Sequence, residues 1–320
     1  MTQQTTTSSV HSLVIDLRQH KPWVYWADFG ASIFVFWACV VFASFISQLV
    51  YVGAAAVAAS FALYRAALFA HEVGHFGKQG VPGFAVTWNA LCGIPIGMPS
   101  FMLKSHVDHH GTASYGTAND PEYLPFAAYP KAQQWFFWGS LLVPGMFTLR
   151  AMVLVPLAWV HRRTRTWLRL RMSYMTMNNA YKPSSSFQRL TGADIAAEAA
   201  TTLWCYGLLA ALLLGWLPWR FALIWFACMM SANMLNAWRT LRVHKYTSVG
   251  MPIDAAGQLK DSTTFTLPVV WGELMCPIGQ RFHAAHHLFP YLPYHALAEA
   301  HKRVLASDWP GLDDYKLTMQ

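Results

Sequence analysis

A nearly uncharged run from Gly30 to Ala70 constrains the fold more than any other stretch of this sequence. One membrane crossing takes about 20 residues, so the run is long enough for two helices. A weak interruption of the apolar run around positions 48–53 separates the two helices, and we expect spans near 30–50 and 53–71. A single helix buried in a soluble core would not need so long an apolar stretch. The second span continues directly into His71, at one edge of the membrane.

A second pair of apolar stretches follows later in the chain. Leu203–Leu217 and Phe221–Trp238 are joined at Pro218, which predicts spans near 196–217 and 219–238. Charged residues make up only 12% of the sequence, whereas soluble domains contain about 25%. We therefore predict an all-α integral membrane protein with about four transmembrane helices.

Two further apolar stretches are interrupted and are not expected to cross the membrane. Residues 81–103 contain several prolines and glycines, and residues 135–160 contain Pro144, Arg150 and Pro156. Proline disrupts a helix interior, so re-entrant or interfacial segments fit better. The chain would then return to the side of His71. This predicts a cap built from residues 104–133, 161–195 and 239–305, within a main domain over 29–305. Residues 1–28 form a polar, flexible tail followed by an interfacial segment, and residues 306–320 form a C-terminal tail.

The loop after this interrupted stretch is strongly basic. Residues 161–190 contain seven Lys and Arg residues and no acidic residue. Cytoplasmic loops of membrane proteins carry such an excess, so we place the cap in the cytoplasm, with a bacterial inner membrane as the expected location. The net charge of +8 could also indicate nucleic-acid binding, but the flanking apolar spans favour the membrane interpretation. The five cysteines form no paired motif and indicate packing rather than disulfides or a thiolate metal site.

Histidines gather in three clusters that suit metal binding. The first is His71-Glu72-Val73-Gly74-His75, and the pattern His-x-x-His-His occurs at His106–His110 and again at His283–His287. On a helix, residues at i, i+3 and i+4 share one face, so each cluster presents two or three imidazoles together. Eight ligands exceed what one tetrahedral zinc needs and suit two metals, with iron and dioxygen chemistry. Alternatively, His71, Glu72 and His75 match the His-Glu-x-x-His motif of zinc hydrolases, although that leaves six histidines without a role. A non-catalytic metal-binding transporter or receptor is a third interpretation.

The motifs HEVGH, HVDHH and HAAHH, in this order and with these intervals, resemble those of the membrane fatty acid desaturase and hydroxylase superfamily. The resemblance runs from about Gly53 to Leu305, and QRFHAAHHLFPYLPYHALAEAH is especially similar to bacterial lipid desaturases. It implies two ferrous (Fe2+) ions at the cytosolic ends of the membrane helices. His244 matches a further ligand position of the family. The implied ligands are His71, His75, His106, His109, His110, His244, His283, His286 and His287.

Acidic side chains near the clusters are candidates for orienting the rings by hydrogen bonds. These are Asp120, Asp108, Glu72 and Glu273, of which Asp120 is the strongest because Asn-Asp-Pro-Glu resembles an Asp-Pro of the family. His295 and His301 are six residues apart, do not share a helix face, and are expected to be structural. Candidates for lining an acyl-chain tunnel are Trp88, Trp135, Phe136, Phe137, Trp138 and Trp271.

The resemblance implies dioxygen-dependent desaturation of the acyl chain of a fatty acid or lipid. Hydroxylation or oxidative decarboxylation at the same metal site are alternatives that no residue separates from desaturation. The sequence contains no haem, flavin or iron–sulfur motif, so the two electrons for each turnover require a separate ferredoxin or cytochrome-like donor with its reductase. The basic loop suits either an acidic carrier or anionic lipid headgroups.

Overall fold

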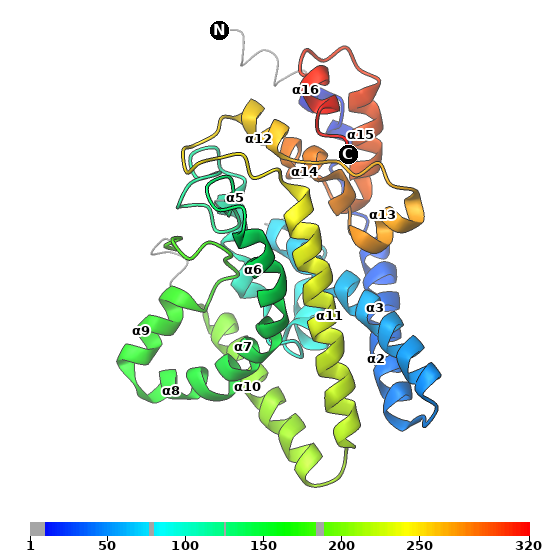
Figure 1. Ribbon diagram of the computed structural model, residues 1–320, viewed down its shortest axis with the longest axis vertical. Helices are drawn as coiled ribbons and strands as arrows, with labels where there is room; N and C mark the ends of the chain where they lie inside the picture. Colours follow the sequence, from blue (N-terminus) through cyan, green and yellow to red (C-terminus); the bar gives the residue numbers. More distant parts are fainter. Residues whose placement is uncertain (1–9, 77–79, 125, 184–188) are drawn as a thin grey trace.

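The computed structural model of the protein describes residues 10–76, 80–124, 126–183 and 189–320, and their regular secondary structure is helical. The described residues contain two isolated β-bridges, His244–Ser262 and Thr264–Met319, but no strand. Long helices stand side by side and short helices form a cap at one end, where α12, α14, α15 and α16 lie (Figure 1). This confirms the predicted all-α membrane fold.

Five helical stretches are long and apolar enough to cross a membrane, rather than four. The four predicted spans correspond to α2 (Pro22–Phe45), α3 (Leu49–His75), α10 (Gly192–Leu213) and α11 (Trp219–Val243). α2 and α3 pack along each other as a hairpin, and α11 packs against both of them. α10 leads into α11 through a short turn, and α10 contacts residues 150–160 rather than α11 along its length. The fifth stretch covers residues Ala132–Val160.

The prolines and the arginine within residues 135–160 do not break the helical path, contrary to the expectation from the sequence. They form α6 (Ala132–Gly139), η4 (Ser140–Leu142), α7 (Val143–Leu149), a π-turn η5 (Arg150–Leu154) and α8 (Val155–Val160) in unbroken succession. Pro144 and Pro156 each stand in the first turn of a helical segment, where no backbone N–H is needed. The chain turns sideways at α8, which packs against α9 (Arg162–Arg171) (Figure 1).

The segment over residues 81–103 does not span, in agreement with the sequence. It forms α4 (Phe84–Trp88), a π-turn η2 (Asn89–Gly93) and η3 (Ser100–Leu103). The indole of Trp88 is fully buried and donates a hydrogen bond of 2.8 Å to the carbonyl of Ala66 on α3. Gly97 has a φ of 80°, and a Cβ there would lie 2.8 Å from the Cβ of Phe147. The segment thus returns the chain along α3 to the end of the molecule where His71 lies.

The cap consists of short helices and turns. Its helices are α5 (His106–His109), α12 (Ala255–Asp261), α13 (Val269–Met275), η6 (Gln280–Phe282), α14 (His283–Leu288), η7 (Tyr294–Ala296), α15 (Leu297–Leu305) and α16 (Leu312–Lys316). α9, which was expected in the cap, lies on the flank beside α8 (Figure 1). A separate apolar cluster around Ala284, Ala285 and Phe289 holds the last of these together. It therefore supports the backbone that carries the third histidine cluster.

Both chain ends pack into this cluster more closely than the sequence indicated. Residues 1–9 lie outside the described part of the chain, but Val10 and Val14 are completely buried against the cap and are not part of a flexible tail. Asp16, in the short helix η1 (Ile15–Leu17), forms an ion pair with Arg303. At the other end Tyr315 is buried within residues 306–320. The terminal segments therefore complete the cap.

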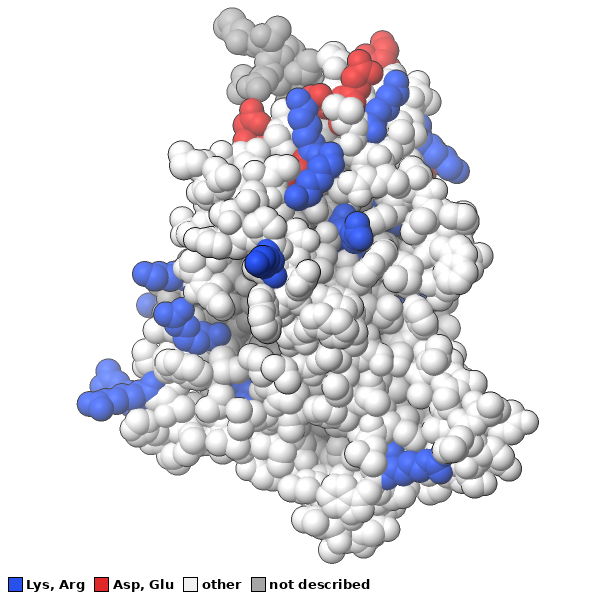
Figure 2. Space-filling view, in the orientation of Figure 1, with Lys and Arg blue, Asp and Glu red and all other residues white. Residues whose placement is uncertain are grey.

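Charged side chains on the face drawn in Figure 2 are concentrated toward the cap and the flank that carries α9, and most of the lower half is uncharged. Exposed large side chains of the long helices, such as Phe34, Leu203 and Leu223, are apolar. A broad apolar surface of this kind is stable only in contact with lipid. The protein is an integral membrane protein with its histidine clusters at one end of the bundle.

Candidate metal centre

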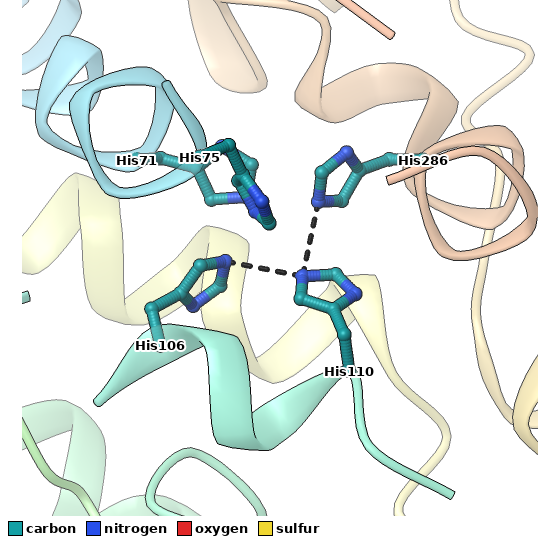
Figure 3. A group of neighbouring side chains, drawn as sticks. All are labelled: His71, His75, His106, His110 and His286. Atoms are coloured by element: carbon teal, nitrogen blue, oxygen red, sulfur yellow. Dashed lines mark hydrogen bonds between the residues drawn. The ribbon is translucent and has the colours of Figure 1, made fainter. Parts of the chain in front are cut away.

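One group of histidines comes from three separate helical segments. His71 and His75 end α3, His106 and His110 belong to the turn of α5, and His286 lies on α14. One ring nitrogen from each of these five residues lies within 4.8 Å of those of all the others (Figure 3). As the sequence predicted, the four-residue spacing within His71/His75 and within His106/His110 places both rings of each pair on the same side of the helix.

A second group completes the set of nine predicted histidines. Its members are His109, His244, His283 and His287, whose ring nitrogens also lie within 4.8 Å of one another. His244 follows the end of α11 directly and is buried, with 5% of the residue exposed. The three clusters of the sequence are therefore divided between two sites. His109 points to one site while its neighbours His106 and His110 point to the other.

The distances between the rings fit ligands that share metal ions. The Nε2 atoms are 3.1 Å apart for His109 and His244, 3.0 Å for His244 and His283, and 3.2 Å for His106 and His110. Two nitrogens bound to one first-row metal ion at about 2.1 Å are separated by roughly 3.0–3.4 Å at octahedral to tetrahedral angles. The described residues also leave the buried Nε2 atoms of His71 and His75 without a hydrogen-bond partner. Both groups thus have the donor type, spacing and unpaired nitrogens that a metal ion requires.

The rings of the cap are held in the neutral form that binds metal. Burial first, and neighbouring imidazoles second, lower the pKa of His110, His283, His286 and His287 well below the usual value. A ring that stays neutral at physiological pH keeps a lone pair available for coordination. Since the described part of both groups contains imidazoles alone, nitrogen-preferring metals such as iron or zinc fit, whereas magnesium and calcium do not.

Two carboxylates orient the second histidine cluster. Both oxygens of Asp120 accept from Nδ1 of His109, at 2.9 and 3.0 Å, and Glu122 accepts from Nδ1 of His106 at 2.5 Å. Burial lowers the pKa of His109, but the adjacent Asp120 outweighs it and raises that pKa. For Glu122, the penalty of burial is outweighed by the electrostatic interaction and hydrogen bond with His106, which hold the pKa of the carboxyl at about 2. Each carboxylate fixes Nδ1 as the protonated nitrogen and leaves Nε2 for the metal.

His244 is oriented by Tyr115 and Asp261, a pair that the sequence did not predict. The hydroxyl of Tyr115 lies 2.9 Å from Nδ1 of His244 and donates to the carboxylate of Asp261, also at 2.9 Å. Asp261 itself lies 3.7 Å from His244 Nδ1 and is almost fully buried. Glu122, in contrast, could have been identified, because it stands two residues after Asp120 in the same Asn-Asp-Pro-Glu motif.

The other proposed acidic partners lie further from the ring nitrogens. Glu72 is buried and accepts hydrogen bonds from the Tyr25 hydroxyl at 2.6 Å and the Tyr294 amide at 3.1 Å, and it lies 3.6 Å from Nδ1 of His71. Asp108 accepts from the Tyr181 hydroxyl. Glu273 instead forms an ion pair with Arg65 and does not orient a ring. His295 and His301 lie outside both groups.

A mostly apolar cavity of about 130 Å³ reaches the five-histidine group. It lies between α3 and α11, and His71 and His106 form part of its wall. None of the six aromatic residues expected to line a tunnel borders it; leucine and methionine side chains such as Leu63 and Met229 do so instead. Trp135, Trp138 and Trp271 are exposed. The aromatic residues therefore serve packing or the lipid interface.

Comparison with known proteins agrees with this architecture. The chain matches the family Fatty acid desaturase over residues 46–318, a range that includes all nine histidines. The chain belongs to the fatty acid desaturase family. A ceramide hydroxylase of Caulobacter vibrioides (strain NA1000 / CB15N) is 35% identical to it over 301 residues, which cover 93% of this chain and 86% of that protein.

Membership of the desaturase family gives the two histidine groups a chemical context. The family and the related hydroxylase support an oxidoreductase that acts on lipid. In this desaturase-family chain, the groups lie at the end of the apolar bundle, and one of them opens into an apolar cavity. The arrangement brings two candidate metal sites and a mostly apolar cavity together at one end of the helical bundle.

Proposed function

We propose that this protein binds two iron ions and uses dioxygen to oxidise the acyl chain of a membrane lipid. The observation that carries the proposal is the meeting of nine imidazoles in two adjacent groups at the end of a membrane bundle. In the proposal His71, His75, His106, His110 and His286 hold one ion, and His109, His244, His283 and His287 hold the other. Residues 29–305 form the functional unit.

The iron ions, when bound, supply the activation of dioxygen and the removal of hydrogen from an unactivated carbon. The residues of the chain position the reactants. Asp120, Glu122 and Asp261 keep the rings in one orientation, directly or through Tyr115. The apolar cavity excludes water and places an aliphatic chain against His71 and His106.

The geometry argues against a zinc hydrolase built on the His-Glu-x-x-His motif. In such an enzyme the glutamate must be free to accept a proton from the attacking water. Here Glu72 is engaged by Tyr25 and by the amide of Tyr294, on the Nδ1 side of His71. In addition, His71 and His75 share their site with three more histidines rather than with a single third ligand.

Desaturation is the outcome that the family resemblance implies, and hydroxylation is a second candidate. Both begin with removal of one hydrogen atom from the chain and differ in whether a second hydrogen is lost or an oxygen is gained. The 35% identity to a ceramide hydroxylase is the specific observation that favours hydroxylation, with a ceramide-like lipid as substrate. No comparable observation favours oxidative decarboxylation.

Electrons must come from a separate ferredoxin or cytochrome-like carrier with its reductase. The exposed arginines of α9, including Arg162 and Arg163, place positive charge on the flank of the molecule (Figure 2). This charge supports a cytoplasmic position for the cap, facing the interior of a bacterial inner membrane. It also suits an acidic carrier or anionic headgroups.

Metal analysis and lipid mass spectrometry test the proposal. The purified protein should contain about two iron ions per chain, whereas a single zinc ion would contradict it. Cells that express the protein should accumulate a lipid that has lost two hydrogen atoms or gained one oxygen atom, which distinguishes the two products. His109→Ala should abolish the product. His301→Ala is the matched control, because this ring bonds to Tyr315 outside both groups.

A further inference from the structure

The cavity beside the five-histidine group has a polar wall, and α11 provides half of its polar side chains. Asn233, Asn236, Arg239 and Thr240 all line the cavity. Their spacing of three or four residues places them on one face of the helix. Polar and charged side chains in a membrane helix are costly and mark functional positions when they face a cavity. Asn233 to Arg239 covers about 9 Å along the helix axis.

These side chains hold one another in place and leave hydrogen-bonding groups free. Nε and Nη2 of Arg239 donate to Oδ1 of Asn236 at 3.3 and 3.0 Å, and Nη1 donates to Gln280. Nδ2 of Asn233 donates to the carbonyl of Met229. In the described part of the chain, Nδ2 of Asn236 and Oδ1 of Asn233 have no partner. The wall therefore offers both amide N–H donors and an amide oxygen acceptor to a ligand.

The charge in the cavity favours an uncharged ligand group. No described carboxylate lies within ion-pair distance of Arg239, but Glu122 lines the same cavity. The two charges have opposite sign, so a carboxylate or phosphate attracted by Arg239 would also be repelled by Glu122. The guanidinium donors already point at Asn236 and Gln280. An amide or a hydroxyl, which both donates and accepts, matches the wall better.

We infer that Asn233 and Asn236, oriented by Arg239, bind an uncharged amide or hydroxyl group of the lipid substrate. His71 and His106 line the same cavity, so the polar group and the reacting carbon occupy one small space. Oxidation then takes place near the polar end of the lipid, and the rest of the chain extends past Leu63 and Met229 toward the membrane. This inference deepens the proposed function, but lipid binding itself can be measured without turnover.

The first test measures binding to the full-length protein in detergent micelles by native mass spectrometry. The probes are N-palmitoylethanolamine, which has an amide and a hydroxyl, together with palmitate and hexadecane. The wild-type protein should prefer N-palmitoylethanolamine to both. Loss of one hydrogen bond should weaken this binding about 10-fold in Asn236→Leu and in Asn233→Leu. Iron content should remain unchanged in both variants.

Ser231→Ala is the matched control, because Ser231 lies on the same helix but lines a separate groove. It should bind all three probes as the wild type does. Equal binding of N-palmitoylethanolamine by the wild type and both asparagine variants would overturn the inference, and so would a preference for palmitate. If Asn236→Leu does not fold, judged by its melting curve, Asn233→Leu and Asn236→Ser decide in its place.

The second test locates the oxidised carbon by fragmenting the lipid product of the wild-type protein. Oxidation in the half of the chain nearest the polar group supports the inference, and oxidation beyond the middle overturns it. Failure of the proposed function would give a different result, namely no iron and no product. In that case the binding comparison still decides whether the α11 wall recognises an uncharged polar group.

Discussion

The carboxylate of Asp120 lies 2.9 Å from Nδ1 of His109, and both side chains are almost completely shielded from solvent. A carboxylate only accepts hydrogen bonds, so the hydrogen must be on Nδ1. The lone pair of His109 is then on Nε2, which lies 3.1 Å from Nε2 of His244. Backbone amides of Gly116, Glu122 and Tyr123 also donate to Asp120 and fix its position. One buried carboxylate thus determines which nitrogen faces the four-histidine group.

Replacing Asp120 with asparagine should weaken metal binding without removing any ligand. The amide can present an N–H to Nδ1 and so favour the wrong tautomer, and losses of this kind typically reduce metal affinity by about 10- to 100-fold. Titration of purified Asp120→Asn with an iron chelator measures the change. Asp108→Asn is the control, since Asp108 bonds to Tyr181 rather than to a ring. Equal iron retention by Asp120→Asn and the wild type would refute the assignment.

The two histidine groups should lose iron separately. His286→Ala removes a ligand only from the five-histidine group, and His283→Ala only from the four-histidine group. Each variant should retain about one iron ion instead of about two, because the other group keeps all its ligands. Elemental analysis gives the iron content, and a spectroscopic signature of coupled iron ions should disappear in both variants. Full iron retention by either variant contradicts this division.

The histidine groups show which part of the site can be predicted from the sequence. Spacings of three and four residues on helices are local, so His71 with His75 and His283 with His286 and His287 follow from helix geometry. The division of the histidines between two sites does not follow from helix geometry, because it depends on how the turn of α5 enters the bundle. His109 and His110 are adjacent in sequence and yet belong to different groups.

The partners that were missed depend on contacts between distant segments. Asp261 reaches His244 because residues 261–264 lie between two other segments: Lys245 donates its backbone N–H to the carbonyl of Asp261, and Ala284 donates to that of Thr263. No local pattern encodes this pairing. Similarly, the interruptions in residues 135–160 indicated a break, but proline is tolerated in the first turn of a helix and the helical path continues. Glu273 was predicted to orient a histidine ring, but it forms an ion pair with Arg65 instead.

His295 should make the cap less stable as pH falls. Burial first, and the charge of Lys21 second, lower its pKa from 6.5 to about 4. Between these values the unfolded chain binds a proton that the folded protein does not, so stability increases with pH and is lost as pH falls below about 6.5. Because the ring is only half-buried, solvent screening keeps the loss well below what the whole pKa shift would give.

Melting temperatures of His295→Gln between pH 4 and 7 measure this contribution. The variant should show a shallower decrease toward low pH than the wild type, because the glutamine has no proton to bind. Parallel curves for His295→Gln and the wild type would exclude His295 as a cause.

The ion pair between Arg150 and Glu198 should stabilise the bundle only as a pair. Both are buried, and Arg150 also donates to the carbonyl of Met172, so the pair ties the π-turn η5 to α10 and to the segment after α9. Arg150→Met should cost about 3–5 kcal/mol because it leaves a buried charge unpaired, whereas the double variant Arg150→Met/Glu198→Met should recover much of that loss. Thermal unfolding in detergent micelles compares the two variants with the wild type.

The exposed ion pair between Asp16 and Arg303 supplies the control. Asp16→Asn, which breaks this pair, should change the melting temperature little. A double variant as unstable as Arg150→Met would show instead that packing or the Met172 contact, and not charge pairing, is what Arg150 provides.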